Sequence, residues 1–242
     1  MTQPSSSAPS AAQAFTFRRR GTQTSRLEAF SDAVFALTLT LLLVSTQVPT
    51  TFRELVDKLS GFLPFVLCFV IFITIWSQHF FFFRRYGLTD ISTIVINSAL
   101  LLVVLFFVYP LKFLFAAVGT DLTFEEARTL FGLYGAGFVA IYALFALLYV
   151  NALRQRAALD LSRVELLDTK SAIWANLGVA TVGIGSILLA QFPQTINAAG
   201  YFYFAILFTR WGQGTLTGRR RRALVAAEHK READGQGTPA AQ

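Results

Sequence analysis

The sequence predicts an all-α, polytopic membrane protein, because it is poor in charge, rich in phenylalanine and divided into long apolar windows. Hydrophobic residues make up 54% of the 242 residues and charged residues only 14%, whereas soluble domains carry about 25% charged residues. A soluble fold of this size could not hide the 25 phenylalanines, several of which form runs such as Phe80–Phe83. These properties place most of the chain in a lipid bilayer.

Six windows of the chain are apolar enough to form transmembrane helices, which need about 20 mainly apolar residues. They lie at about residues 26–46, 61–83, 91–118, 130–153, 171–192 and 195–211. The sixth window is short. Pro193 separates the last two windows and predicts a tight hairpin between them, because proline cannot continue a helix. We therefore expect one six-helix transmembrane domain over residues 26–211.

Polar tails flank this domain. Residues 1–25 are rich in Ser, Ala, Gln and Thr, and they lack the basic, apolar and cleavage regions of a secretory signal in the required order. Residues 212–242 combine the basic run Arg219–Arg222 with Gly, Pro and Ala. We expect a disordered cytosolic tail over residues 1–25 and a basic, mostly disordered cytosolic tail over residues 212–242.

The placement of the basic residues predicts the orientation, since Lys and Arg concentrate in the cytoplasmic loops of membrane proteins. With both ends of the chain inside, all but four of the 21 Lys and Arg residues lie on the cytoplasmic side. The exceptions are Arg53, Lys58, Lys112 and Arg128. We predict a multi-pass protein of the cell membrane with both termini cytoplasmic, and this clustering favours membrane topology over nucleic-acid binding.

The residue types needed for catalysis are scarce. His79 and His229 are the two histidines, Cys68 is the single cysteine, and no metal-binding pair, glycine-rich phosphate loop or nucleophile elbow occurs. We therefore expect neither an enzyme nor a bound metal or cofactor. Three glycines in the fifth window predict close helix packing through small residues, namely Gly178, Gly183 and Gly185.

A few polar residues fall inside the apolar windows, where ionisable groups are costly and are functional candidates. With alternating helix direction, Arg26 and Asp32 of the first window lie at a depth similar to that of His79 in the second and Asn97 in the third. Trp76 could add an indole donor. These groups can satisfy one another, or alternatively they anchor the helices at the cytosolic interface.

The remainder of the first window carries a stripe of residues at helical spacing. Leu37, Leu41 and Val44 share one face, and Thr40 lies on its flank. Such a stripe can face lipid or a protein core. If several copies surrounded an axis, it would instead form rings, in which a hydrophobic ring gates by dewetting and a hydroxyl ring replaces part of the water shell of an ion.

The motif Arg26-x-x-x-Phe30-Ser31-Asp32 at the start of the first window resembles the signature of the transmembrane protein 175 family, in its bacterial branch. His79 after Trp76, Asn97 in the third window and the six-helix length agree with it. The resemblance implies a potassium-preferring cation channel that assembles as a homotetramer, with the first helix of each subunit lining the pore.

The resemblance also implies roles for single residues. Leu37 would form the constriction nearest the motif, Thr40 the ion-selective layer, and Leu41 and Val44 further apolar layers, although a longer aliphatic residue than Val44 is expected there. The motif residues would form a structural polar network rather than touch permeating ions, together with residues of the next two helices; its members are Arg26, Phe30, Ser31, Asp32, Trp76, His79 and Asn97. The carbonyl-lined Thr-Val-Gly-Tyr-Gly filter is absent, so modest selectivity is expected.

Two other functions remain open from the residues alone. In a proton-coupled secondary transporter, Asp32 and His79 would relay protons, although the broken helices and repeats typical of transporters are not evident. In a non-conducting scaffold, the basic tails would bind anionic lipid or a partner. The partners expected for the channel are its own copies, the bilayer and potassium ions, without nucleic acid.

Overall fold

The computed structural model describes residues 17–21, 25–44, 50–53, 62–117 and 121–206. All regular secondary structure in these residues is helical, which confirms the predicted all-α class. The elements are α1 (Arg26–Val44), α3 (Phe62–Tyr86), α4 (Ile91–Ala116), α5 (Phe124–Arg154), α6 (Arg163–Leu189), α7 (Ile196–Tyr201) and the short 3-10 helix η1 (Phe202–Phe204).

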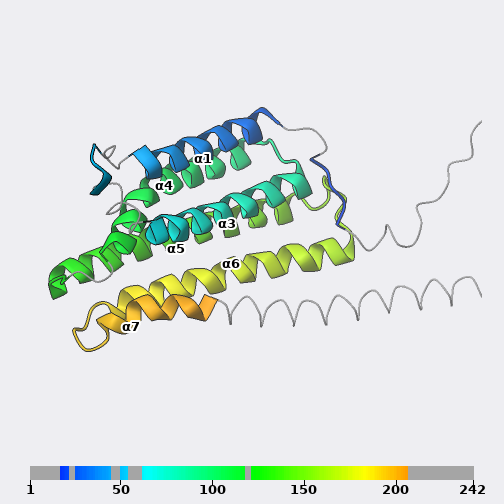
Figure 1. The fold of residues 1–242 in the computed structure, drawn as a ribbon. Helices are drawn as coiled ribbons and strands as arrows, with labels where there is room; N and C mark the ends of the chain where they lie inside the picture. Colours follow the sequence, from blue (N-terminus) through cyan, green and yellow to red (C-terminus); the bar gives the residue numbers. More distant parts are fainter. Residues whose placement is uncertain (1–16, 22–24, 45–49, 54–61, 118–120, 207–242) are drawn as a thin grey trace, which may run out of the picture.

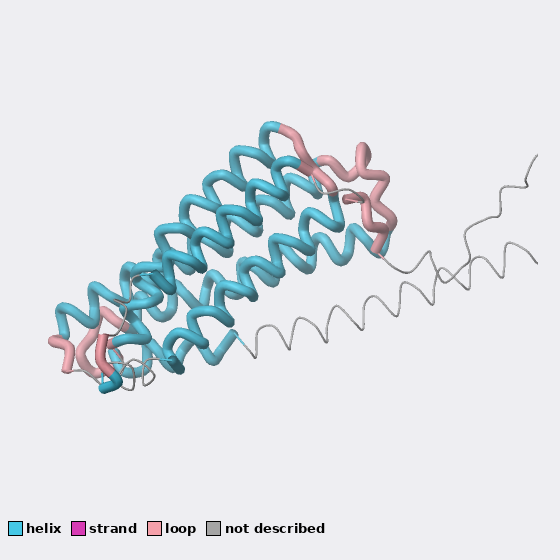
Figure 2. Tube along the Cα trace, turned by 45° about the horizontal axis from the view of Figure 1, so that its top comes forward, coloured by secondary structure: helices cyan, strands magenta, loops and turns pink. Residues whose placement is uncertain are grey.

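The long helices lie side by side with their connections at the two ends of the bundle (Figure 2). Helix α1 packs on α3 and α4, α4 packs on α5, and α5 packs on α6. Figure 1 places α1 along one edge of the bundle and α6 along the opposite edge. We call the end where α1, α4 and α6 begin the proximal end, and the other end the distal end.

The lengths and surfaces of the helices suit a bilayer. Helices α3, α4, α5 and α6 are long and apolar enough to cross a membrane, and α1, with 19 residues, falls within the spanning range of about 17–25 residues. On α4, the side chains of Val95, Leu102 and Phe106 are 62%, 57% and 65% exposed. An apolar surface of this kind is unfavourable in water, but it is favourable against lipid or a neighbouring subunit.

Two helices begin earlier than their apolar windows predict. Helix α5 starts at Phe124 rather than near residue 130, and α6 starts at Arg163 rather than near residue 171. In both cases a reciprocal capping box defines the start, from Thr123 with Glu126 and from Ser162 with Glu165. Capping satisfies the free amides of a polar first turn, so a hydropathy window misses that turn.

Other boundaries agree or fall outside the described residues. The proline-bearing turn after α6 leads into α7 and η1, which occupy part of the predicted sixth helix; residues 207–211 lie outside the described part, as does most of each predicted tail. Residues 17–21 depart from the prediction. Their composition predicts a disordered tail, but they pack against the proximal end of the bundle.

Helices α5 and α6 approach closely where small residues meet. A Cβ atom on Gly183 would lie 2.7 Å from Cγ2 of Val139, and one on Gly135 would lie 3.4 Å from the carbonyl oxygen of Gly183. This agrees with the predicted packing role of Gly183, because backbones of membrane helices approach closely through small residues. On the other side of α5, α4 packs against α1 and α3.

Candidate functional site

A buried chain of hydrogen bonds joins α1, α3 and α4. Asn97 of α4 is its centre: Nδ2 donates to Oγ of Ser31 at 2.9 Å, and Oδ1 lies 2.8 Å from Nε2 of His79. Ser31 donates its own hydroxyl to the carbonyl oxygen of Leu27 at 2.7 Å. Ser31, His79 and Asn97 each have an exposed fraction of 0%, so these bonds replace water that the groups cannot reach.

The bonding partners fix the direction of this chain. Because Ser31 gives its only proton to Leu27, its oxygen accepts from the amide nitrogen of Asn97. The amide oxygen of Asn97 must then accept, so His79 carries its proton on Nε2. Nδ1 of His79 is buried and finds no hydrogen-bond partner among the described residues. Nε2 of the imidazole is therefore a hydrogen-bond donor held in a fixed orientation.

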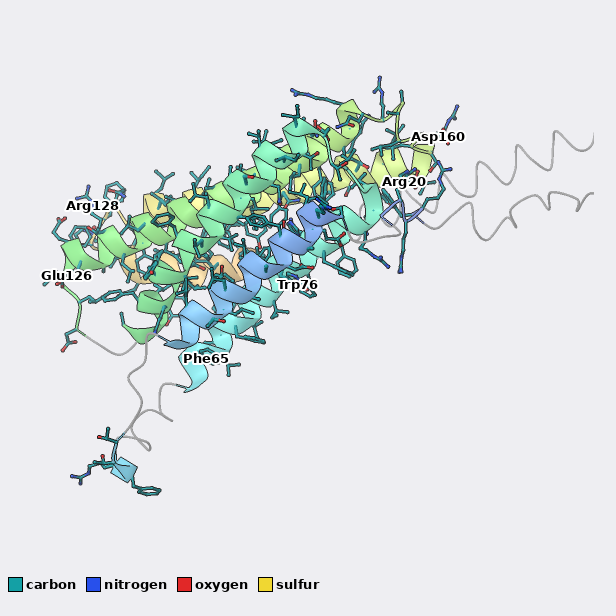
Figure 3. The ribbon with its side chains drawn as sticks, turned by 90° about the horizontal axis from the view of Figure 1, so that it is seen from above. Arg20, Phe65, Trp76, Glu126, Arg128 and Asp160 are labelled. Carbon is teal, nitrogen blue, oxygen red and sulfur yellow. The ribbon has the colours of Figure 1, made fainter. Side chains whose placement is uncertain are left out.

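A second polar contact joins α1 to α3. The indole Nε1 of Trp76 donates to Oδ1 of Asp32 at 2.8 Å, and Trp76 extends from α3 beside α1 in Figure 3. The ring of Trp76 also stacks on that of Phe80, with centroids 5.6 Å apart. Asp32 thus bonds to Trp76, while His79 bonds to Asn97, so the two titratable groups belong to separate contacts.

Two residues of the predicted network take other positions. Arg26 makes no hydrogen bond or ion pair to the side chains of this network within the described part of the chain. Phe30 is 60% exposed and lies on the open side of α1. The structure therefore brings together Ser31, Asp32 and their three partners on α3 and α4, but not Arg26 or Phe30.

Helix α1 has one packed face and one open face. Phe35, Thr38 and Leu42 are 3%, 0% and 2% exposed. On the other side, Leu37 is 54% and Leu41 36% exposed, and Thr40 is exposed with them. The side chain of Val44 lies outside the described residues. We call Phe30, Leu37, Thr40 and Leu41 the open face of α1.

The two threonines of α1 are separated by this division. Thr38 is buried and donates its hydroxyl to the carbonyl oxygen of Val34 at 2.7 Å. Thr40 is exposed and donates its hydroxyl to the carbonyl oxygen of Ala36 at 3.0 Å. Because that proton points back at the helix, the Thr40 oxygen presents lone pairs to the open face. Of the two threonines described on α1, Thr40 is therefore the one whose hydroxyl oxygen reaches the open face.

Sequence reasoning did not single out a further polar bond between α3 and α6. Nε2 of Gln78 donates to Oδ1 of Asn176 at 2.5 Å, and Asn176 donates to the carbonyl oxygen of Ala172 at 2.8 Å. Both amides lie within apolar windows, which is the signal that could have identified them. The bond ties α6 to α3 directly, as does the buried hydrogen bond of 2.7 Å between the hydroxyls of Tyr86 and Thr169.

At the proximal end, Asp90 organises a third polar cluster outside the spanning segments. Its carboxylate accepts from Oγ1 of Thr93 at 2.6 Å and from Nδ2 of Asn151 at 3.2 Å, and it caps α4. Burial raises the pKa of Asp90, but hydrogen bonds from Thr93, Gln155 and Asn151 outweigh it and bring the pKa to about 2. The cluster fastens the start of α4 to the end of α5.

We expect Asp90 to stabilise the fold in a pH-dependent way. Its folded pKa of about 2 is below the ordinary 3.8, so its ionised form contributes stability above pH 3.8 and loses it as the pH falls through about 2. In thermal unfolding of the purified protein, Asp90→Asn should therefore melt lower than wild type at neutral pH, with the gap closing in this window. A constant gap would contradict this. Asp160→Asn, whose side chain is exposed, is the control.

Sequence comparison identifies a family model and two curated relatives. The model described as endosomal/lysosomal potassium channel TMEM175 matches residues 26–108, which include every residue of the polar network. A protein of Marivirga tractuosa named a potassium channel is 38% identical over 231 residues, covering 86% of this chain and 94% of that protein. A potassium channel of Chamaesiphon minutus is 30% identical over 138 residues, covering 54% and 66% of the two chains.

Two solved structures are similar to the fold. The crystal structure of a variant of the potassium channel MtTMEM175, in complex with a nanobody–MBP fusion protein, superposes with a TM-score of 0.75 at 35% identity and covers 84% of this chain and 97% of that one. A lysosomal potassium-selective channel TMEM175 homolog from Chamaesiphon minutus has a TM-score of 0.52 at 23% identity, with 78% and 97% covered, which bears on the fold alone.

Proposed function

The chain belongs to the TMEM175 family, and we propose from this premise that it is a potassium-preferring cation channel in which four copies surround a pore lined by α1. The relatives are named as potassium channels, and none of them is named as an enzyme. The observation that carries the proposal is the open face of α1, since a spanning helix at the edge of its subunit offers Leu37, Thr40 and Leu41 to neighbours.

Conduction in this arrangement needs little polar surface. Four copies of Leu37 form a narrow apolar ring that a hydrated ion crosses only at a cost, because water leaves such a constriction. Four Thr40 oxygens next along the helix offer lone pairs that replace part of the hydration shell. The layer favours cations over anions because its protons are bound to backbone carbonyls. Leu41 and Val44 add further apolar layers.

The polar network supports the pore helix rather than the ion in this proposal. Ser31 and Asp32 bond to their partners on the packed side of α1, away from the open face. The hydrogen-bond chain from His79 leads to Asn97 and not to Asp32, so the described residues offer no continuous proton relay for a coupled transporter. The basic residues near the proximal end, such as Arg84 and Arg85, favour a cytoplasmic position for it.

Potassium flux into liposomes tests the function. Wild-type protein should pass potassium faster than sodium with no added substrate or pH gradient, and chloride should not pass. Flux no greater than that of empty vesicles, from intact tetramers, would refute a channel. Uptake that saturates and requires a proton gradient would favour the transporter instead.

The selectivity layer has its own matched pair of variants. Thr40→Val should lower the potassium-to-sodium flux ratio by roughly threefold or more, because valine removes the oxygen but keeps the shape. Thr38→Val removes the same type of backbone hydrogen bond from the buried face, and it should leave the ratio unchanged. Equal effects of the two substitutions would exclude Thr40 as the ion-selective layer.

A further inference from the structure

Residues Phe17–Gly21 form a strap across the proximal end of the bundle, which we call the N-terminal strap. The ring of Phe17 packs edge-on against Tyr86, with centroids 5.3 Å apart, and the guanidinium of Arg85 lies 5.1 Å from the Phe17 ring centroid. The backbone nitrogen of Arg20 donates to the carbonyl oxygen of Arg85 at 3.4 Å. The strap therefore lies against the end of α3.

A buried ion pair fastens the strap to α6. Arg20 donates from Nη2 and Nη1 to the two carboxylate oxygens of Glu165 at 2.8 and 3.1 Å, and from Nε to the carbonyl oxygen of Leu159 at 2.9 Å. The side chains are only 17% and 4% exposed. Two-point pairing of this type is strong and geometrically specific. We call this pair the latch.

A second ion pair on the strap differs from the latch in exposure. Nη2 of Arg18 lies 3.0 Å from Oδ2 of Asp160, but these side chains are 55% and 89% exposed. Exposed pairs of this kind contribute little to stability. Figure 3 shows Arg20 and Asp160 at the same end of the molecule. The strap thus carries one buried and one exposed ion pair, and the exposed pair serves as the control for the buried one.

Gly21 lets the strap reach the backbone of α3. A Cβ atom at this position would lie 2.5 Å from the carbonyl oxygen of Phe83, so any larger residue forces the strap outward. The amide of Gly21 donates to the carbonyl oxygen of Arg84 at 3.4 Å, and Nη1 of Arg84 donates to the carbonyl oxygen of Gly21 at 3.2 Å. The strap therefore ends in a backbone contact with α3 that has no room for a Cβ atom at position 21, so this contact requires glycine.

The strap connects to α1 in two ways. Along the chain, only residues 22–25 separate Gly21 from Arg26, so their Cα atoms lie at most about 18 Å apart. Through space, a row of side chains one turn apart on α3 leads from Arg84 to α1. The guanidinium of Arg84 lies 5.8 Å from the Phe80 ring centroid, Phe80 stacks on Trp76, and Trp76 bonds to Asp32.

We propose that the N-terminal strap sets the position of the proximal end of α1, and that Arg20 is a positioning residue for potassium selectivity. The inference rests on the proposed function of α1 as the pore helix. The latch holds the strap against α6, and the strap holds both the start of α1 and the row of side chains that contacts Asp32. When the latch is released, the four copies of α1 no longer hold the same position. The spacing between the four Thr40 oxygens then varies, and the layer distinguishes potassium from sodium less well.

The test compares neutral variants of the latch with matched controls in liposome flux. Arg20→Gln and Glu165→Gln remove the ion pair, and glutamine at the second position can retain the capping box with Ser162. Asp160→Asn makes the same carboxylate-to-amide change at the exposed pair. We expect the potassium-to-sodium flux ratio to fall at least about twofold in both latch variants and to stay at the wild-type value in Asp160→Asn.

A second comparison displaces the strap without changing any charge. Gly21→Ala should lower the ratio as the latch variants do, whereas Gly132→Ala on α5, where a Cβ atom meets nothing within 4 Å, should not. If one variant fails to form tetramers, the others still decide the matter.

The flux ratio separates positioning from a purely structural role. Fewer folded channels lower potassium and sodium flux equally, so reduced flux with an unchanged ratio in the strap variants would overturn the proposal. An unchanged flux and ratio would overturn it too. Absence of flux from the wild type would instead refute the proposed function, and it is recognised before any variant is compared.

Discussion

Potassium flux should rise about tenfold when Leu37 is replaced by serine, equivalent to a barrier lower by about 1.4 kcal/mol. If Leu37 forms the apolar ring, four serine hydroxyls would let water and ions stay in the constriction. The measurement is ion flux per reconstituted tetramer. Leu102→Ser is the control, because Leu102 is 57% exposed, close to the 54% of Leu37, but lies on α4.

The comparison has a clear contrary outcome. If Leu37→Ser leaves flux unchanged while tetramers remain intact, or if Leu102→Ser raises it equally, the narrowest apolar point of the pathway is elsewhere. If Leu37→Ser raises the flux but leaves the potassium-to-sodium ratio unchanged, Leu37 forms the barrier and another residue forms the ion-selective layer. We expect this outcome because Leu37 and Thr40 occupy separate positions on the open face.

The largest loss of stability is expected from Asn97→Leu. Leucine has a similar size, but it leaves Oγ of Ser31 and Nε2 of His79 without the partners that Asn97 provides. Nε2 of His79 would lose its hydrogen-bond partner, at a cost of about 1–3 kcal/mol, whereas Ser31 would lose one bond of about 1 kcal/mol and keep its bond to Leu27. The free energy of unfolding should therefore fall by about 2–4 kcal/mol. Thermal unfolding in detergent measures this as a reduced melting temperature.

Ser98→Ala provides the matched control on α4. Ser98 follows Asn97 directly and is exposed, so its loss should leave the melting temperature near that of the wild type. Equal stability of Asn97→Leu and wild type would mean that the three-helix hydrogen-bond chain is not a structural support.

The sequence predicts the spanning helices well where hydropathy is the controlling property. The centres of α1, α3 and α4 follow from long apolar runs, since a bilayer demands such runs. The early starts of α5 and α6 do not, because polar capping residues such as Ser162 and Glu165 control them. The capping pattern at Thr123 and Glu126 is visible in the sequence, which indicates that caps should extend a hydropathy window.

The polar network is predictable in part because polar groups in a membrane are few. Depth alone brings Ser31, Asp32, His79 and Asn97 near one another, and the structure supplies their pairing. The latch is different. Arg20 and Glu165 lie 145 positions apart, and both occur in charged segments where many pairings are equally plausible, so no local pattern could identify the pair.

The orientation of the bond chain through Asn97 has a consequence for how the helices line up along the membrane normal. Apolar helix surfaces in lipid can slide past one another with little change in packing energy, since lipid tails are as apolar as leucine side chains. Donor and acceptor atoms cannot slide in this way. A slip of one residue moves a helix by about 1.5 Å, which breaks the bonds that this helix makes to its neighbours, from His79 to Asn97 or from Asn97 to Ser31. The network therefore fixes the position of α1 along the membrane normal, that is, its height relative to the other helices of the subunit. In the proposed four-copy pore, the side chains of Leu37, or those of Thr40, meet in one plane only when all four subunits hold α1 at the same height.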